Sequence, residues 1–155
     1  MLTTCLWFDT EGEEAATFYT SVFPSSKITD VARYGAGGPR PEGTVMTVAF
    51  ELEGQPFLAL NGGPQYTFSE AISFVVSCDD QEEVDRYWET LSEGGEEGPC
   101  GWLKDRFGVS WQVVPEALPR LLADPDRERS QRVMAAMMQM KKIQIDELEQ
   151  AASLV

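Results

Sequence analysis

A segment near the start of the chain returns, loosely, in its second half. Residues 5–23 read CLWFDTEGEEAATFYTSVF, and residues 74–92 read FVVSCDDQEEVDRYWETLS. Each copy runs from a short apolar stretch through an acidic turn into a helical pattern, with an aromatic pair on the inner helix face. A repeat this long that occurs only twice indicates a duplicated half-domain rather than a solenoid.

The repeat continues through a hairpin after each helix. Residues 51–61 (ELEGQPFLALN) match residues 104–114 (KDRFGVSWQVV), so that Gly54 corresponds to Gly108 and Phe57 to Trp111. Both halves therefore predict the order strand, helix, three strands. In a duplicated fold of this kind, we expect a ligand site between the two halves.

The first half predicts one helix among four strands. Asp9 or Thr10 is the expected N-cap and Pro24 the expected stop, because these residue types favour helix ends. The loop at 35–43, GAGGPRPEG, is rich in the residues that interrupt strands. The expected elements are strands at 4–9, 26–35, 44–52 and 56–61, and a helix at 11–23.

The second half repeats this order and then adds a helical tail. The strand at 71–78 is nearly all apolar, so we expect it to be buried on both faces. Asp79 or Asp80 should cap the next helix and Gly94-Gly95 should end it. In module two we expect this helix to run to about 93, followed by a weak strand at 95–99 and strands at 99–104 and 109–114. In the tail we expect one helix at 116–123, a second that starts at Asp124-Pro125 and runs to about 140, and a last short helix capped by Asp146.

We expect one domain of 155 residues. Module one covers about 1–65, module two about 70–115 and the C-terminal helices about 116–155. A chain of this length can bury a sizeable core, and no flexible linker separates the tail from the body.

Charge and cysteine content restrict the partners and the compartment. The net charge is −14, so the chain has no basic patch to neutralise the phosphates of a nucleic acid or to bind an anionic membrane. Cys5, Cys78 and Cys100 are odd in number and form no CxxC motif, which favours a reducing compartment. The start MLTTCLWFD lacks the features of a signal peptide, and no segment is apolar enough to span a membrane. We expect a cytoplasmic protein.

Several longer strings match a known pattern. They are Trp7-Phe8-Asp9, Phe18-Tyr19, Leu60 to Pro64, Tyr87-Trp88, Gly101 to Asp105, Phe107 to Pro115, Gln131 to Met134 and Met140 to Ile143. With these strings the chain resembles the PhnB-like branch of the vicinal oxygen chelate superfamily, which includes glyoxalases, bleomycin-resistance proteins and dioxygenases. The resemblance implies an α+β fold in which two βαβββ modules form curved mixed sheets around a cavity, commonly as a homodimer. Members often carry the label 3-demethylubiquinone-9 3-methyltransferase, but we find no glycine-rich strand–turn–helix suited to S-adenosylmethionine.

The sequence departs from the superfamily at its metal positions. Metal-using members place His or Glu there, whereas this chain has Thr4 or Cys5, Leu58, Ser73 or Phe74, and Gln112, and it contains no histidine. Open catalytic sites for zinc or iron need about three imidazole, thiolate or carboxylate ligands. We therefore expect no metal and no other cofactor. The missing histidine also excludes Ser-His and Cys-His relays, so the catalytic residues stay unknown.

Aromatic and amide side chains are the candidate ligand-binding residues, and each has a purely structural alternative. Trp7 and Trp102 either form a wall that stacks on a planar ligand or pack in the core. Gln112 occupies a superfamily ligand position that faces the cavity, so its neighbour Trp111 should point to the helix side. Asn61 and Gln65 flank a Gly-Gly-Pro break, where they either orient a ligand or serve the turn.

Acidic, thiol and thioether groups leave further alternatives open. Asp105 is either a turn acceptor paired with Arg106 or a general base. Cys5 and Cys78 are expected to be buried and inert, and Cys100 to lie in an exposed stretch. The tail methionines either pack on the sheet or form a dimer contact. They are Met134, Met137, Met138 and Met140.

Three functions remain compatible with these patterns. The first is a metal-free protein that binds a small apolar or aromatic molecule in a cavity lined by Trp and Phe. The second is an enzyme that uses a cavity carboxylate or Cys, which would require a paired, buried acid. The third is a homo-oligomeric interaction module built on the tail helices, which would require an exposed apolar patch there.

Overall fold

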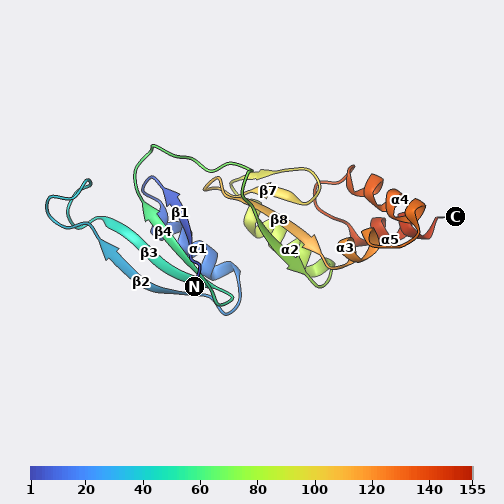
Figure 1. Cartoon of the computed structure of the whole chain (residues 1–155), viewed down its shortest axis with the longest axis horizontal. Coiled ribbons are helices and arrows are strands. Elements are labelled where there is room, and N and C mark those ends of the chain that lie inside the picture. The colour runs from blue at the N-terminus through green and yellow to red at the C-terminus, as the bar shows by residue number, and fades with distance from the viewer. Residues whose placement is uncertain (155) are drawn as a thin grey trace. The chain divides into compact units, whose positions relative to one another are not determined.

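The computed structural model describes residues 1–154, which form two compact units. The first unit covers Met1–Phe68 and corresponds to module one, while the second begins at Ser69 and contains module two and the tail (Figure 1). The expected α+β architecture of two βαβββ modules with a C-terminal helical appendix is confirmed. That the whole chain folds as a single domain stays a prediction.

Module one is a four-stranded mixed sheet covered on one face by a helix. The strand order is β1-β4-β3-β2, with β1 parallel to β4 and the other neighbours antiparallel. Helix α1 packs against β3 and β4. The elements are β1 (Thr4–Phe8), α1 (Gly12–Val22), β2 (Lys27–Arg33), β3 (Val45–Leu52) and β4 (Gln55–Asn61).

The core of module one is aromatic. The Tyr19 ring of α1 stacks on Phe50 of β3 with ring centroids 6.3 Å apart, and Phe50 stacks on Phe57 of β4 at 5.3 Å. These three side chains are almost completely buried. Offset stacking of this kind adds to the stabilisation that burial gives. Of the aromatic pair in the first repeat copy, Tyr19 is therefore the core member.

Module two repeats the topology with shorter strands. Its strand order is β5-β8-β7-β6, again with the first strand parallel to the last one and the others antiparallel. Tyr87 and Trp88 of α2 are both buried, at positions that correspond to Phe18 and Tyr19. The elements are β5 (Phe74–Cys78), α2 (Gln81–Ser92), β6 (Glu96–Glu97), β7 (Trp102–Lys104) and β8 (Ser110–Pro115).

One strand expectation was wrong. Strand β5 does not bury both faces in the described chain, because Val75 is 58% exposed while Val76 is buried. The apolar run therefore alternates, and its second face carries no covering helix.

Three expected helix caps were also wrong. Helix α1 has Glu11 at its N-cap position without a side-chain cap. Helix α4 is capped by Asp126 rather than Asp124, and α5 follows Gln144, so that Asp146 lies in its first turn. The cap of α2 is Asp80, one of the two residues expected.

The tail is built of α3 (Ala117–Leu122), α4 (Arg127–Met137) and α5 (Ile145–Ser153). Its helices share a small core around Val133, Ile143 and Leu148, all fully buried. The side chain of Gln81 on α2 ties the tail to module two, because it accepts the Ile145 N–H at 2.8 Å and donates to the Ile143 carbonyl at 3.0 Å.

The tail methionines divide between packing and exposure. Met140 is buried and Met137 packs against the tail core, whereas Met134 and Met138 are 44% and 58% exposed. Within residues 1–154, no helix combines the length and the apolar character needed to cross a lipid bilayer.

Candidate functional site

The uncovered face of the module-one sheet is apolar. Strand alternation places Cys5 and Trp7 of β1 on this face, opposite Leu58 and Leu60 of β4. These side chains are partly or largely exposed, while the residues between them are buried beneath α1. We call these four residues the module-one open face.

The indole of Trp7 is held by the segment that follows β4. Its Nε1–H donates to the Gly63 carbonyl at 2.9 Å, and its ring makes an edge contact with Tyr66 at 4.9 Å. A Cβ on residue 62 would lie 2.4 Å from the indole carbons, so Gly62 is required for this approach. The Gly-Gly break therefore positions Trp7.

Gln65 lies at the same end of the sheet. A Cβ on Gly63 would meet the Gln65 Oε1 at 2.5 Å and an Arg40 guanidinium nitrogen at 3.0 Å. Arg40 in turn pairs with Asp9 at 3.6 Å. The structure thus brings Trp7 and Gln65 together around the segment after β4, and the role of Gln65 toward a ligand stays a prediction.

Asn61 lies on the helix side of the same sheet. Its Oδ1 accepts the Gly12 N–H at 2.8 Å, and its Nδ2 donates to the Val45 carbonyl at 3.2 Å. The side chain is buried and stands in for the missing cap of α1. Its predicted contact with a ligand remains untested. The sequence did not indicate its partner Gly12, where an added Cβ would lie 2.7 Å from the Asn61 Oδ1.

The uncovered face of the module-two sheet is more polar. Gln112 of β8 lies between Trp102 of β7 and Val75 of β5 in the strand register, so all three share this face. The Gln112 Nε2 donates to the Ser73 Oγ at 3.0 Å. Trp102 and Gln112, which we predicted as site residues, are therefore neighbours. We call these four residues the module-two open face.

Asp105 forms the centre of the turn between β7 and β8. Its Oδ1 accepts the N–H groups of Phe107 at 2.9 Å and Val109 at 3.0 Å, and its Oδ2 accepts the Trp111 Nε1–H at 2.8 Å. Asp105 is 3% exposed, and Trp111 is equally buried on the helix face, as its alternation with Gln112 predicts. The geometry is that of a turn acceptor, whereas a role of Asp105 in ligand binding stays a prediction.

A pocket of about 150 Å³ opens beside β7 in module two. Ser110 lines it, is 2% exposed, and has an Oγ without a hydrogen-bond partner among residues 1–154. No sequence pattern indicates Ser110, since an isolated serine before an aromatic residue is typical of many strands. The other lining residues are Glu70, Glu96, Glu97, Gly98, Pro99, Trp102, Leu103 and Lys104.

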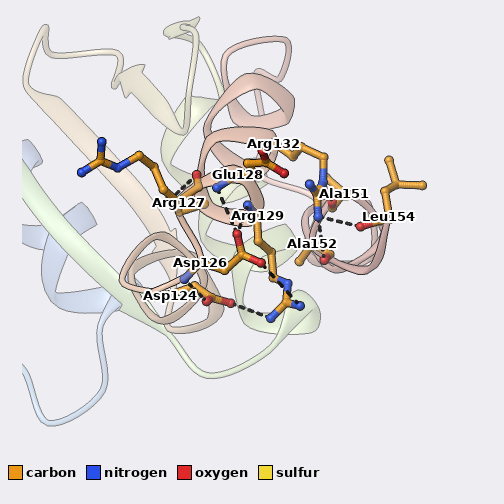
Figure 2. Close-up of polar contacts among 10 residues, drawn as sticks. Asp124, Asp126, Arg127, Glu128, Arg129, Arg132, Ala151, Ala152 and Leu154 are labelled. Carbon is orange, nitrogen blue, oxygen red and sulfur yellow. Dashed lines mark hydrogen bonds and ion pairs between the residues drawn. The ribbon is translucent and has the colours of Figure 1, made fainter.

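A larger hollow of about 580 Å³ lies among the tail helices. Several of its charged side chains contact one another or the backbone, and Figure 2 shows that Arg129 pairs with Asp124 at 3.2 Å and with Asp126 at 3.9 Å. Arg132 donates to the carbonyls of Ala151 at 3.0 Å and Leu154 at 2.6 Å, which closes the end of α5. These groups hold the tail together.

The residues at the superfamily's metal positions do not fit a metal. On the open faces, Leu58 has no donor atom, Cys5 is a single thiol, and Ser73 and Gln112 are neutral and bonded to each other. Among residues 1–154, no three His, Cys, Asp or Glu side chains are grouped closely enough to share an ion.

The three thiols occupy different environments. Cys78 is buried, and desolvation raises the pKa of its thiol to about 12. Cys5 lies in an exposed position, so the expectation that it is buried was wrong. Partial desolvation of its thiol still raises the pKa of Cys5. Cys100 is partly buried, with its Sγ 3.7 Å from the Met138 Sδ.

Paired four-stranded mixed sheets of this topology define a glyoxalase-like fold of the vicinal oxygen chelate superfamily. The chain belongs to the family described as 3-demethylubiquinone-9 3-methyltransferase, in its PhnB-like branch, which it matches over residues 1–114. Residues from Pro115 onward lie outside that match, so the assignment of the tail to the family stays a prediction. No functionally curated protein matches the chain.

Solved structures support this placement. The chain is similar to a putative 3-demethylubiquinone-9 3-methyltransferase, PhnB protein, from Bacillus cereus, at 37% identity and a TM-score of 0.66, covering 74% of this chain and 98% of that one. A protein from Pseudomonas aeruginosa is 21% identical, with a TM-score of 0.62 over 75% of this chain and 97% of that one, which supports the fold alone. Fosfomycin resistance protein FosX from Mesorhizobium loti is 12% identical, with a TM-score of 0.53 over 74% of this chain and 89% of that one, which supports the fold alone.

Proposed function

We propose that this protein binds a small apolar or aromatic molecule without a metal. The observation that carries the proposal is the module-one open face, where an indole and two leucines lie on a sheet face that no helix of the module covers. Protein sites for small molecules are mostly apolar, with a few placed polar groups. Fold membership alone names no ligand, because one fold serves many functions.

Within this proposal, the residues divide into two roles. In module one, Trp7 contacts a ligand and Gln65 supplies the polar group that orients it. In module two, Trp102 and Gln112 have the corresponding roles. Asn61 and Asp105 act indirectly, because protein N–H groups already occupy their side-chain oxygens. Asn61 fixes the start of α1 against the sheet, and Asp105 holds the turn between β7 and β8.

We also propose a cytoplasmic homodimer. Met134 and Met138 are exposed on the tail, and flexible thioether side chains adapt well to a partner surface. Light scattering at micromolar concentration should give about twice the 17.2 kDa mass of the chain. A monomer mass that persists when the protein is concentrated would contradict the dimer while leaving the binding proposal intact.

The binding proposal is tested with a neutral, fluorescent apolar probe, Nile red, and two tryptophan variants. Trp102→Ala should weaken probe binding and change the melting temperature little, because this indole is only partly buried. Trp111→Ala should lower the free energy of unfolding by about 3–5 kcal/mol, since it removes a core indole. Both effects are read from probe titrations and from thermal melts without probe.

A large loss of stability in Trp102→Ala with little loss in Trp111→Ala would move the ligand wall to the opposite sheet face. An absence of saturable Nile red binding by the unmodified protein would reject the proposed function. Trp7→Phe is the matching variant in module one, because it keeps a ring on the module-one open face while removing the indole N–H that bonds to Gly63.

A further inference from the structure

The pocket beside β7 contains a buried polar group that the protein leaves unpaired. The Ser110 hydroxyl can donate one hydrogen bond and accept two, yet its Oγ has no partner among residues 1–154. An unpaired buried polar group destabilises a fold, so folded proteins rarely retain one without a reason. Because Ser110 lines the pocket, a bound molecule is a suitable partner for its hydroxyl.

The charges around the pocket select the sign of that molecule. Glu70, Glu96 and Glu97 supply three carboxylates and Lys104 one ammonium, which leaves a local charge of −2. Lys104 is already paired with Glu70, and this hydrogen bond lowers the pKa of Glu70 and raises that of Lys104. Both groups therefore stay charged near neutral pH, and Lys104 is not available to an anion.

Glu96 and Trp102 complete the recognition surface. Glu96 of β6 lies opposite Lys104 of β7 in the strand register, so both share the sheet face that also carries Trp102 and Ser110. An indole face attracts cations, and a carboxylate forms strong, charge-assisted hydrogen bonds with an ammonium group. A volume of about 150 Å³ admits a group of a few heavy atoms.

We propose that this pocket binds a small primary alkylammonium group, with Ser110 and Glu96 accepting its hydrogen bonds and Trp102 contacting its cationic end. This inference goes beyond the proposed function, because it assigns an amine site to module two alone. The pocket lies entirely within module two, so it can be tested separately from the apolar face of module one.

The test uses the full-length protein and three isosteric probes. The probes n-propylammonium, 1-propanol and propionate are titrated while ¹H–¹⁵N spectra follow the Ser110 amide and the Trp102 indole N–H. Only the ammonium should give saturable shifts, with a dissociation constant of about millimolar, as expected for four heavy atoms. Added salt should weaken the binding, because the attraction is partly electrostatic.

Two variants and two controls sharpen the outcome. Ser110→Ala and Glu96→Gln should each weaken ammonium binding about tenfold, since each removes one hydrogen bond to a charged group. Ser77→Ala removes an exposed hydroxyl from the same sheet face, and Glu147→Gln removes one charge from α5, and neither should change the affinity. Ser110→Ala should also keep or raise the melting temperature, so loss of binding cannot be attributed to unfolding.

Three results would overturn the inference. Saturable binding of propionate, equal binding of 1-propanol and n-propylammonium, or unchanged affinity in Ser110→Ala each contradict an amine site. Nile red binding together with no response to any of the three probes would reject this pocket and retain the proposed function. Ammonium binding without Nile red binding would retain the pocket and reject the apolar ligand.

Discussion

The two modules bury their helices in the same way and cap them differently. Helix α1 begins without a cap of its own, and Asn61, 49 residues along the chain, accepts the Gly12 N–H from the end of β4. Helix α2 is capped by Asp80, whose carboxylate accepts the N–H of Glu83 only three residues away. The repeat is therefore a repeat of apolar positions, while each half has its own polar contacts.

The hairpins show the same contrast. In module one, Glu53 and Gly54 connect β3 to β4 as a two-residue turn, both with positive φ, which matches the twist of the strands. In module two, the corresponding connection is longer and is organised by the buried Asp105 carboxylate. One turn depends on backbone conformation and the other on a single side chain.

Among the contrasts between the two modules, the largest expected effect comes from removing that side chain. Asp105→Ala should lower the free energy of unfolding by about 3–4 kcal/mol, because it leaves two backbone N–H groups and the Trp111 indole N–H without their acceptor. Glu53→Ala, in the equivalent turn of module one, should cost less than about 0.5 kcal/mol. Urea unfolding monitored by circular dichroism measures both, and equal losses would contradict the contrast between the turns.

The two helix caps should differ by a smaller amount. Asn61→Ala should cost about 2 kcal/mol, because a buried cap and a bond to the Val45 carbonyl are both lost. Asp80→Ala should cost about 1 kcal/mol, since water can replace an exposed cap. The same unfolding experiment ranks the two variants, and a larger loss in Asp80→Ala would reverse the argument.

This division explains how much of the fold could be predicted from the sequence. Periodicity and the repeat gave the order of strands and helices, because both report which residues face the core. The alternation along β8 placed Trp111 and Gln112 on opposite faces correctly. Individual side-chain hydrogen bonds leave no periodic trace, so the Asn61 cap of α1 and the Asp105–Trp111 bond could not be predicted.

The candidate site divides in the same way. Trp102 and Gln112 were identified from aromatic character and from the superfamily resemblance, and the register brings them together. Ser110 was missed because its significance depends on burial and on the lack of a protein partner, which only the structure provides. The N-caps of α4 and α5 each lie two residues from the expected position, because Asp126 takes the place of Asp124 and α5 starts after Gln144 without a side-chain cap.

The smallest expected effect comes from a contact between module two and the tail, the ion pair of Asp85 on α2 with Lys142. Hydrogen bonds from Gln81 and Lys142 lower the pKa of Asp85 below its usual range. A lowered pKa in the folded state means that the contact stabilises the protein above the unfolded pKa of about 4 and loses this contribution as the pH falls through the folded value.

Asp85→Asn should therefore cost less than about 1 kcal/mol at pH 7, because Asp85 and Lys142 form a largely exposed pair. The difference from the unmodified protein should disappear in strong acid, after the pH has fallen through the folded-state pKa of Asp85 and its carboxylate is protonated. Glu89→Gln, on an exposed face of the same helix, provides the control and should show no such change. Urea unfolding under both conditions measures the differences, and an Asp85→Asn difference that stays constant between them would show that the contact depends on shape rather than charge.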